Sequence, residues 1–142
     1  MPGVRTHEEL DVWKLSQEVV TRVRQLLKTP TLRADFQLRD QLSRAAEKIG
    51  PNIAEGFSRF VPGDNARFIR IAKASLTEVI VHLETAVAKG YLKAAEIQIP
   101  SRFARRARGA ATQYILYLET AKPPKASESR REDKEQASEE RD

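Results

Sequence analysis

Apolar and small residues recur at helical spacing in four stretches of the chain. In the first, steps of three and four residues connect Leu10, Trp13, Ser16, Val20, Val23 and Leu27. This spacing is typical of one face of an α-helix. We expect the helix to begin near Glu8 and to end near Lys28, because Thr29 precedes a proline and is biased away from helical geometry.

The second stretch is interrupted by Gly50 and Pro51. Its expected core positions are Phe36, Leu38, Leu42, Ala45, Ile49, Ile53 and Phe57. A proline inside a helix removes one backbone hydrogen bond and clashes with the preceding turn. Because the apolar period nevertheless resumes in phase at Ile53, the sequence predicts one long helix, kinked at Gly50-Pro51, instead of two helices.

The third and fourth stretches follow in the same manner. The third has Asp64 as its expected N-cap and Gly90 as its end. Its core stripe is Phe68, Ala72, Leu76, Val79, Leu83, Ala86 and Val87. The fourth is expected to begin near Pro100, since proline suits the first position of a helix. Its core stripe is Phe103, Ala107, Ala110, Tyr114 and Leu118.

Four such helices with short connections favour an all-α fold, an antiparallel up-down-up-down four-helix bundle. We assign this bundle to residues 1–121. Residues 122–142 lack apolar periodicity and are rich in Pro, Ser and charged residues, a composition that predicts a disordered charged tail. The last turns of the fourth helix are apolar nearly all round, which predicts an oligomer interface at Tyr114, Ile115, Leu116 and Tyr117.

Composition narrows the class of protein. A chain of 142 residues suits one domain. The absence of cysteine excludes disulfides and thiol catalysis and fits a reducing cytoplasm. No window approaches the roughly 18 apolar residues of a membrane span. We therefore expect a cytoplasmic protein that does not enter a membrane.

The chain is basic, with 25 Lys and Arg against 20 Asp and Glu and a net charge of +5. The excess lies before residue 122, and it suits a polyanionic partner such as nucleic acid. On the fourth helix the outer side carries Arg102, Arg105, Arg106 and Arg108. Residues that could extend this patch are Arg22, Arg24, Arg67, Arg70 and Lys73. Guanidinium groups bind phosphate with paired hydrogen bonds, so we predict nucleic-acid binding here; the alternative is a solvated helix face.

Catalytic and metal-binding patterns are missing from the sequence. A di-iron bundle needs Glu-x-x-His on two helices, but the histidines are His7 and His82, and Glu78 lies four residues from His82. A serine nucleophile needs a histidine base and an orienting acid, and the sequence offers no such set for Ser75. No phosphate-binding glycine loop occurs. We expect no enzyme activity, no cofactor and no metal.

Four segments together carry a family resemblance. They are His7-Glu-Glu-Leu-Asp-Val-Trp13, Gln41-Leu-Ser-Arg-Ala-Ala46, Ile49-Gly-Pro-Asn-Ile-Ala-Glu-Gly56 and Ile71-Ala-Lys-Ala-Ser-Leu-Thr-Glu78. In this order they resemble the four-helix-bundle family of proteins encoded in intervening sequences of bacterial 23S rRNA genes, over roughly residues 8–118. Lys48 and Ala74 depart from the family pattern, which usually has a small polar residue and a glycine there.

The resemblance implies a single-domain bundle that assembles into a homopentamer. It also implies a distant relation to the accessory variability determinant of diversity-generating retroelements, a basic pentameric bundle that binds nucleic acid and a reverse transcriptase. The family itself has no firmly established biochemical role, and its ribosomal label does not imply membership of the ribosome.

The most recognisable family element consists of Asn52, Ile53, Ala54, Glu55 and Gly56. One interpretation is a polar site at the surface or at a subunit contact. The other is structural: Asn52 hydrogen-bonds backbone groups freed by the kink, Gly56 permits close helix approach, and Glu55 pairs with a basic residue such as Arg44.

Two functions follow from these patterns. The first is a non-enzymatic homo-oligomer, pentameric by the resemblance, that binds RNA or DNA through its basic surface. The alternative is an adaptor that docks a protein partner, such as a polymerase, without nucleic acid.

Overall fold

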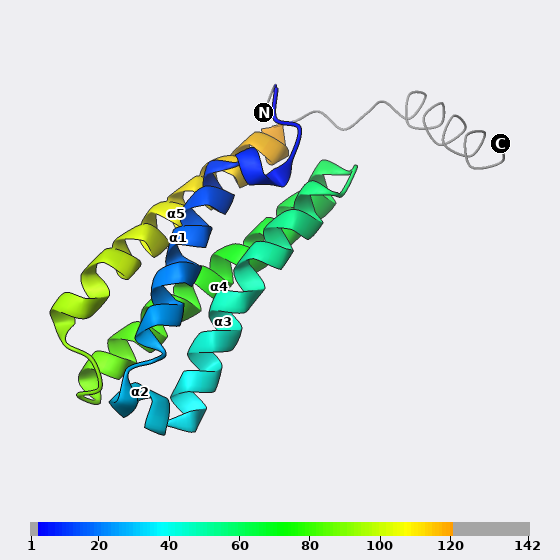
Figure 1. Ribbon diagram of the computed structural model, residues 1–142. Coiled ribbons are helices and arrows are strands. Elements are labelled where there is room, and N and C mark those ends of the chain that lie inside the picture. The colour runs from blue at the N-terminus through cyan, green and yellow to red at the C-terminus, as the bar shows by residue number, and fades with distance from the viewer. Residues whose placement is uncertain (1–2, 121–142) are drawn as a thin grey trace, which may run out of the picture.

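A computed structural model describes residues 3–120, so the predicted tail at 122–142 lies outside the described residues. The elements are a short 3-10 helix η1 (His7–Glu9) and the α-helices α1 (Asp11–Leu26), α2 (Pro30–Ala34), α3 (Phe36–Phe57), α4 (Pro62–Ala88) and α5 (Ala94–Thr120). The described residues contain no strand, which confirms the all-α prediction. The four long helices lie side by side as a bundle, with α2 at one end (Figure 1).

The core lies between the four long helices. Helix α4 packs against both α3 and α5, and α1 closes the bundle against α5 and α3. Fully buried side chains include Val23, Ile49, Ile53, Leu76 and Leu83. Burying one such side chain contributes about 1.5 to 3 kcal/mol. The predicted stripes therefore face inward, with two exceptions. Phe36 is 71% exposed because it is the first residue of α3 and precedes the first buried turn. Phe68 is half-buried outside the core, with Arg59 and Arg67 over its ring.

Helix α3 runs from Phe36 to Phe57 with Pro51 inside it, which confirms one helix in place of two; the kink stays a prediction. Gly56 lies where α3 approaches α4. A Cβ atom at this position would lie 3.0 Å from both the Asn65 carbonyl oxygen and the Phe68 Cβ. The absent side chain thus permits the close approach of these helices.

Helix α5 begins at Ala94, six residues before the predicted start at Pro100. The Glu96 side chain accepts a hydrogen bond of 3.1 Å from the Lys93 backbone N–H, and the Glu96 N–H donates to the Lys93 carbonyl. This capping contact stabilises the first turn. Pro100 lies inside the helix and is buried, where the loss of one backbone hydrogen bond is offset by packing.

Other helix bounds also differ from the prediction. Helix α4 begins at Pro62 with Val61 as its N-cap, so Asp64 lies in the first turn and is not the cap. There its charge complements the helix dipole. The short helix α2 was not predicted; it begins at Pro30 and buries Leu32 completely. Helix α1 begins at Asp11, three residues after the predicted start at Glu8, because residues 7–9 form the separate 3-10 helix, and it ends at Leu26, two residues before Lys28.

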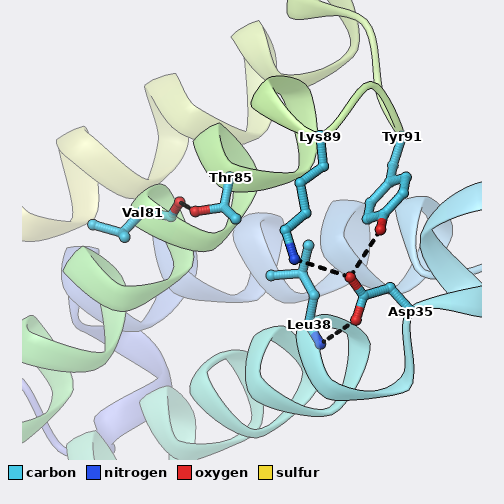
Figure 2. A network of polar contacts seen from close by, with 6 residues as sticks. All are labelled: Asp35, Leu38, Val81, Thr85, Lys89 and Tyr91. Carbon is cyan, nitrogen blue, oxygen red and sulfur yellow. Dashed lines mark hydrogen bonds and ion pairs between the residues drawn. The ribbon is translucent and has the colours of Figure 1, made fainter.

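Asp35 connects two chain reversals at the α2 end of the bundle (Figure 2). As N-cap of α3, its Oδ1 accepts a hydrogen bond of 3.1 Å from the Leu38 N–H. Its Oδ2 accepts hydrogen bonds from the Tyr91 hydroxyl at 2.9 Å and from Lys89 Nζ at 3.2 Å. The Leu38 N–H, together with the Tyr91 and Lys89 donors, lowers the pKa of Asp35, because each favours the carboxylate. The same contact raises the pKa of Tyr91.

Between residues 3 and 120, every helix falls short of the length and apolar character that crossing a membrane requires.

Candidate functional site

The structure places the four predicted arginines of α5 on two sides of that helix. Arg105 and Arg108 face α4: Arg105 lies 3.7 Å from a Glu84 carboxylate oxygen, and Arg108 Nη1 donates to Thr77 Oγ1 at 3.4 Å. Arg106 instead lies over the Phe103 ring, 5.7 Å from its centroid, and Arg102 is exposed. The predicted continuous patch is therefore divided.

Arg105 and Arg108 line a groove between α4 and α5 together with a third cation, Lys73. The groove is lined by Lys73 and Thr77 from α4 and by Arg105, Arg108, Gly109 and Thr112 from α5, and its volume is about 440 Å³. We call it the α4–α5 groove. Its walls carry positive charge from both helices, so an anion inside it would be attracted from two sides.

The cations of this groove have few acidic partners. Among residues 3–120, no carboxylate lies within 4.0 Å of the Lys73 ammonium or the Arg108 guanidinium, and both side chains are half-buried. Arg105 has Glu84, but both side chains are more than half exposed, and such ion pairs contribute little. The groove therefore keeps most of its positive charge.

Two threonine hydroxyls in the groove form hydrogen bonds with backbone carbonyls of their own helices. Thr77 Oγ1 donates to the Lys73 carbonyl at 3.3 Å while it accepts the hydrogen bond from Arg108. Thr112 Oγ1 donates to the Arg108 carbonyl at 3.0 Å. The Lys73 ammonium and the remaining guanidinium N–H groups are left as donors. A planar guanidinium with free N–H groups matches the oxygens of a phosphate.

The other predicted basic residues lie elsewhere or are paired. Arg22 lies over the Phe103 ring at 5.0 Å and 3.5 Å from a Glu18 oxygen. Arg24 lies beside Trp13 and Gln17 on the side of α1 that faces α3. The remaining two are on α4: Arg67 stacks on Phe68, and Arg70 forms an ion pair with Glu119. Of the predicted extensions, only Lys73 joins Arg105 and Arg108.

The family element 52–56 forms local contacts on α3. Asn52 Nδ2 donates to the Lys48 carbonyl at 2.7 Å. Glu55 pairs with Arg59 at 2.5 Å, whereas Arg44 pairs with Asp40 at 3.1 Å. Glu55 thus pairs with a basic residue, as predicted, but that residue is Arg59, two positions beyond the end of α3, and not Arg44.

Of the other members of this element, Ile53 is buried in the core and Ala54 is half-buried. The element therefore contributes packing and i,i+4 contacts along α3.

Two of the four residues that were predicted to form an oligomer interface on α5 are buried inside this chain. Tyr114 and Ile115 pack in the core of this chain, so they do not present a surface to a partner. Leu116 and Tyr117 remain, 48% and 41% exposed. The stretch looks apolar all round in sequence because its inner and outer sides are both apolar, and only the outer side is available for association.

Metal ligands do not converge in the described part of the chain. Within residues 3–120, no group of three or more His, Asp or Glu side chains could hold a metal ion. His7 packs edge-on against Trp13 with ring centroids 4.5 Å apart, and His82 is half-buried on α4.

Sequence reasoning missed Thr77, Gly109 and Thr112 as groove residues. Gly109 carried a usable signal, because a glycine inside a helix costs about 1 kcal/mol relative to alanine. The two threonines carried none, since their place depends on how α4 and α5 face each other.

Comparisons with known proteins agree with the fold. Residues 8–108 match the model of a family described as 23S rRNA-intervening sequence protein. A solved structure from Bacteroides thetaiotaomicron, a protein of unknown function from the S23 ribosomal protein family, is 20% identical. The match covers 73% of this chain and 97% of that chain, with a TM-score of 0.67. Among curated proteins the chain has no significant match.

Proposed function

The chain belongs to the 23S rRNA-intervening sequence protein family, and on that premise we propose that it is a non-enzymatic cytoplasmic protein that binds nucleic acid, RNA or DNA, through the α4–α5 groove. One observation carries the proposal: Lys73, Arg105 and Arg108 converge on one groove from two helices. Nucleic-acid affinity without sequence choice rests mainly on such contacts to phosphate.

The proposal includes assembly into a homo-oligomer, pentameric by family resemblance. Leu116 and Tyr117 support it, because they expose apolar surface next to each other on α5. Repetition of the groove around a ring would multiply the phosphate contacts made by one nucleic acid.

The proposal also includes the finer architecture, with α1, α3, α4 and α5 in antiparallel up-down-up-down order and α3 kinked at Gly50-Pro51. Contacts between α4 and α5 support the antiparallel order. Arg70 pairs with Glu119, Thr77 contacts Arg108, and Glu84 pairs with Arg105, so the partners descend along α5 as they ascend along α4.

A binding titration tests the function directly. The variant Lys73→Gln/Arg108→Gln removes the two groove cations that have no acidic partner. One to two lost charge-assisted hydrogen bonds, at about 1.5 kcal/mol each, should raise the Kd for a labelled oligonucleotide about ten- to a hundredfold. The affinity should also depend less on salt, with the log–log slope smaller by about 0.7 for each lost contact to a single strand.

The matched control is Arg44→Gln/Lys48→Gln, which removes two exposed positive charges from α3. If binding depends on the groove, this control keeps most of the affinity. Equal loss in both variants would mean that net charge alone attracts the nucleic acid. Absence of binding to RNA and DNA at low salt would rule the function out and leave the protein adaptor as the remaining alternative.

A further inference from the structure

Gly109 lies inside α5, yet neither the helix conformation nor the packing requires a glycine there. Its φ angle is not positive; within residues 3–120, Gly3 and Gly90 are the residues that adopt that conformation. Its missing Cβ would have nothing within 4 Å. Gly50 and Gly56, in contrast, fit tightly against Trp13 and against Asn65 and Phe68. Glycine weakens a helix, so its presence at position 109 calls for another reason.

The position of Gly109 supplies that reason. It lines the α4–α5 groove together with the three cations. A side chain at position 109 would project into the free space of this groove, because nothing else fills it. The glycine therefore keeps the groove open beside Arg105 and Arg108, where a ligand can approach the helix backbone closely.

The groove is a broad depression that is open to solvent, with a volume of about 440 Å³. A phosphate group can therefore enter it directly from the surface. The cations lie on both walls, so the ligand must present its charge to two sides at once. An unpaired strand is flexible enough to bring one phosphate down between the two helices, whereas a duplex is stiff over this length.

One end of the groove also suits a short unpaired strand. Val81 lies one turn beyond Thr77 on α4 and is 50% exposed, so it offers an apolar contact surface for an unpaired base. Farther along lie the carboxylates of Glu84 and Glu119, which repel phosphate. From Arg70 to Glu84, α4 rises about 21 Å, so only a few nucleotides fit between them.

We propose that the α4–α5 groove binds a short stretch of single-stranded nucleic acid, with one phosphate seated over Gly109 between Lys73 and the two arginines. This inference rests on the proposed function and adds the strand state and the place of the phosphate. Sequence-tolerant binding of single strands combines a basic groove with aromatic stacking; this groove supplies the first of these, and the six residues that line it include no aromatic side chain.

Two substitutions of Gly109 test the inference with the full chain. Gly109→Ala should raise the Tm, because alanine favours the helix, and it should weaken binding of a labelled single-stranded oligonucleotide severalfold. Gly109→Leu should fill the groove and raise the Kd at least about tenfold without lowering the Tm. Gly63→Ala is the control, since its Cβ would also have nothing within 4 Å but lies in the first turn of α4, outside the groove. It should leave the Kd unchanged.

The competitors distinguish the sources of phosphate. A single strand should displace the labelled strand at lower concentration than a duplex of the same sequence, and both inorganic phosphate and a mononucleotide should compete far more weakly. Equal competition by the duplex, or unchanged affinity of Gly109→Leu, would overturn the inference. The proposed function would survive either result if Lys73→Gln/Arg108→Gln still weakens binding. Competition by inorganic phosphate as strong as that of the strand would identify a small-anion site and overturn the inference as well.

Discussion

The Asn65 side chain donates a hydrogen bond of 2.8 Å from Nδ2 to the Tyr114 hydroxyl inside the bundle. Both residues are buried, and the Asn65 Oδ1 atom has no hydrogen-bond partner among the described residues. Burial raises the pKa of Tyr114, although the Asn65 hydrogen bond lowers it in part. The contact joins the start of α4 to the last turns of α5, directly beside Gly56.

Tyr114→Phe should destabilise the protein, because it leaves the buried Asn65 amide without any partner. A buried polar group that loses its partner costs about 1 to 3 kcal/mol. Urea unfolding followed by circular dichroism measures this, with Tyr117→Phe as the exposed control. The double variant Tyr114→Phe/Asn65→Ala should lose less than the two single losses combined. Strict additivity would show that the two side chains are not coupled.

Gly56→Ala should be more damaging than its size suggests. The added methyl group would lie 3.0 Å from the Asn65 carbonyl oxygen and the Phe68 Cβ, so α3 and α4 must move apart. Overpacking of this kind costs about 1 to 3 kcal/mol. The same change at Gly63, which has open space, should be neutral or slightly stabilising. A Tm for Gly56→Ala equal to that of the wild type would contradict the close approach.

The Asp35 contacts should make stability depend on pH at both extremes. Because hydrogen bonds lower the pKa of Asp35 from its ordinary value of 3.8, they contribute in full above that pH and are lost as pH falls through the lowered pKa. The Tm difference between wild type and Asp35→Ala should therefore be largest near neutral pH, and it should shrink in acid as the carboxylate becomes protonated. A gap that stays constant below pH 3.8 would refute the role of the carboxylate.

Tyr91 gives the opposite dependence. Its pKa is raised above 10.0 by the hydrogen bond to Asp35, so the contact contributes below that pH and is lost as pH rises through the raised pKa. Tyr91→Phe should lower the Tm near neutral pH, and the difference should shrink in strongly alkaline solution. Thermal unfolding across this range measures it, and Tyr117→Phe, which lacks this contact, serves as the control.

Leu116→Glu/Tyr117→Glu should weaken self-association without unfolding the bundle, because both side chains are exposed in the single chain. Light scattering of the wild type should give a multiple of 16.1 kDa, fivefold for the pentamer. The variant should shift toward one chain. Ile99→Glu, another exposed apolar position on α5, serves as the control. A wild-type mass of one chain at micromolar concentration would remove oligomerisation from the proposal.

The helices and their inner sides follow largely from the sequence, because apolar periodicity survives even a proline. Ile53 resumes the pattern after Pro51, and α3 does continue through it. Helix starts were less predictable. Pro100 resembled a first residue, but Glu96 caps an earlier turn through a contact that no apolar pattern reports.

The candidate site depended on how the helices face one another. Four arginines within seven residues of α5 suggested one patch. Arg105 and Arg108 instead lie on the side of α5 that faces α4, while Arg106 lies over the Phe103 ring. Lys73 joins them from a helix more than thirty residues earlier in the chain. Such pairing across helices is set by packing of the bundle, which sequence spacing along a single helix does not encode.

The Asp35 network also determines where this chain can be cut or extended. Residues 89–92 hold a buried Leu92 and a Tyr91 that bonds Asp35, with its carbonyl accepting from Thr31 at 2.8 Å. A peptide tag inserted there would separate these contacts. The connection at 58–61 is exposed, and its contacts are with the adjoining ends of α3 and α4: Arg59 pairs with Glu55 and lies over Phe68, and the Val61 carbonyl accepts from the Asn65 N–H. Tag insertion or circular permutation should therefore succeed at residues 59–61 and fail at 90–92.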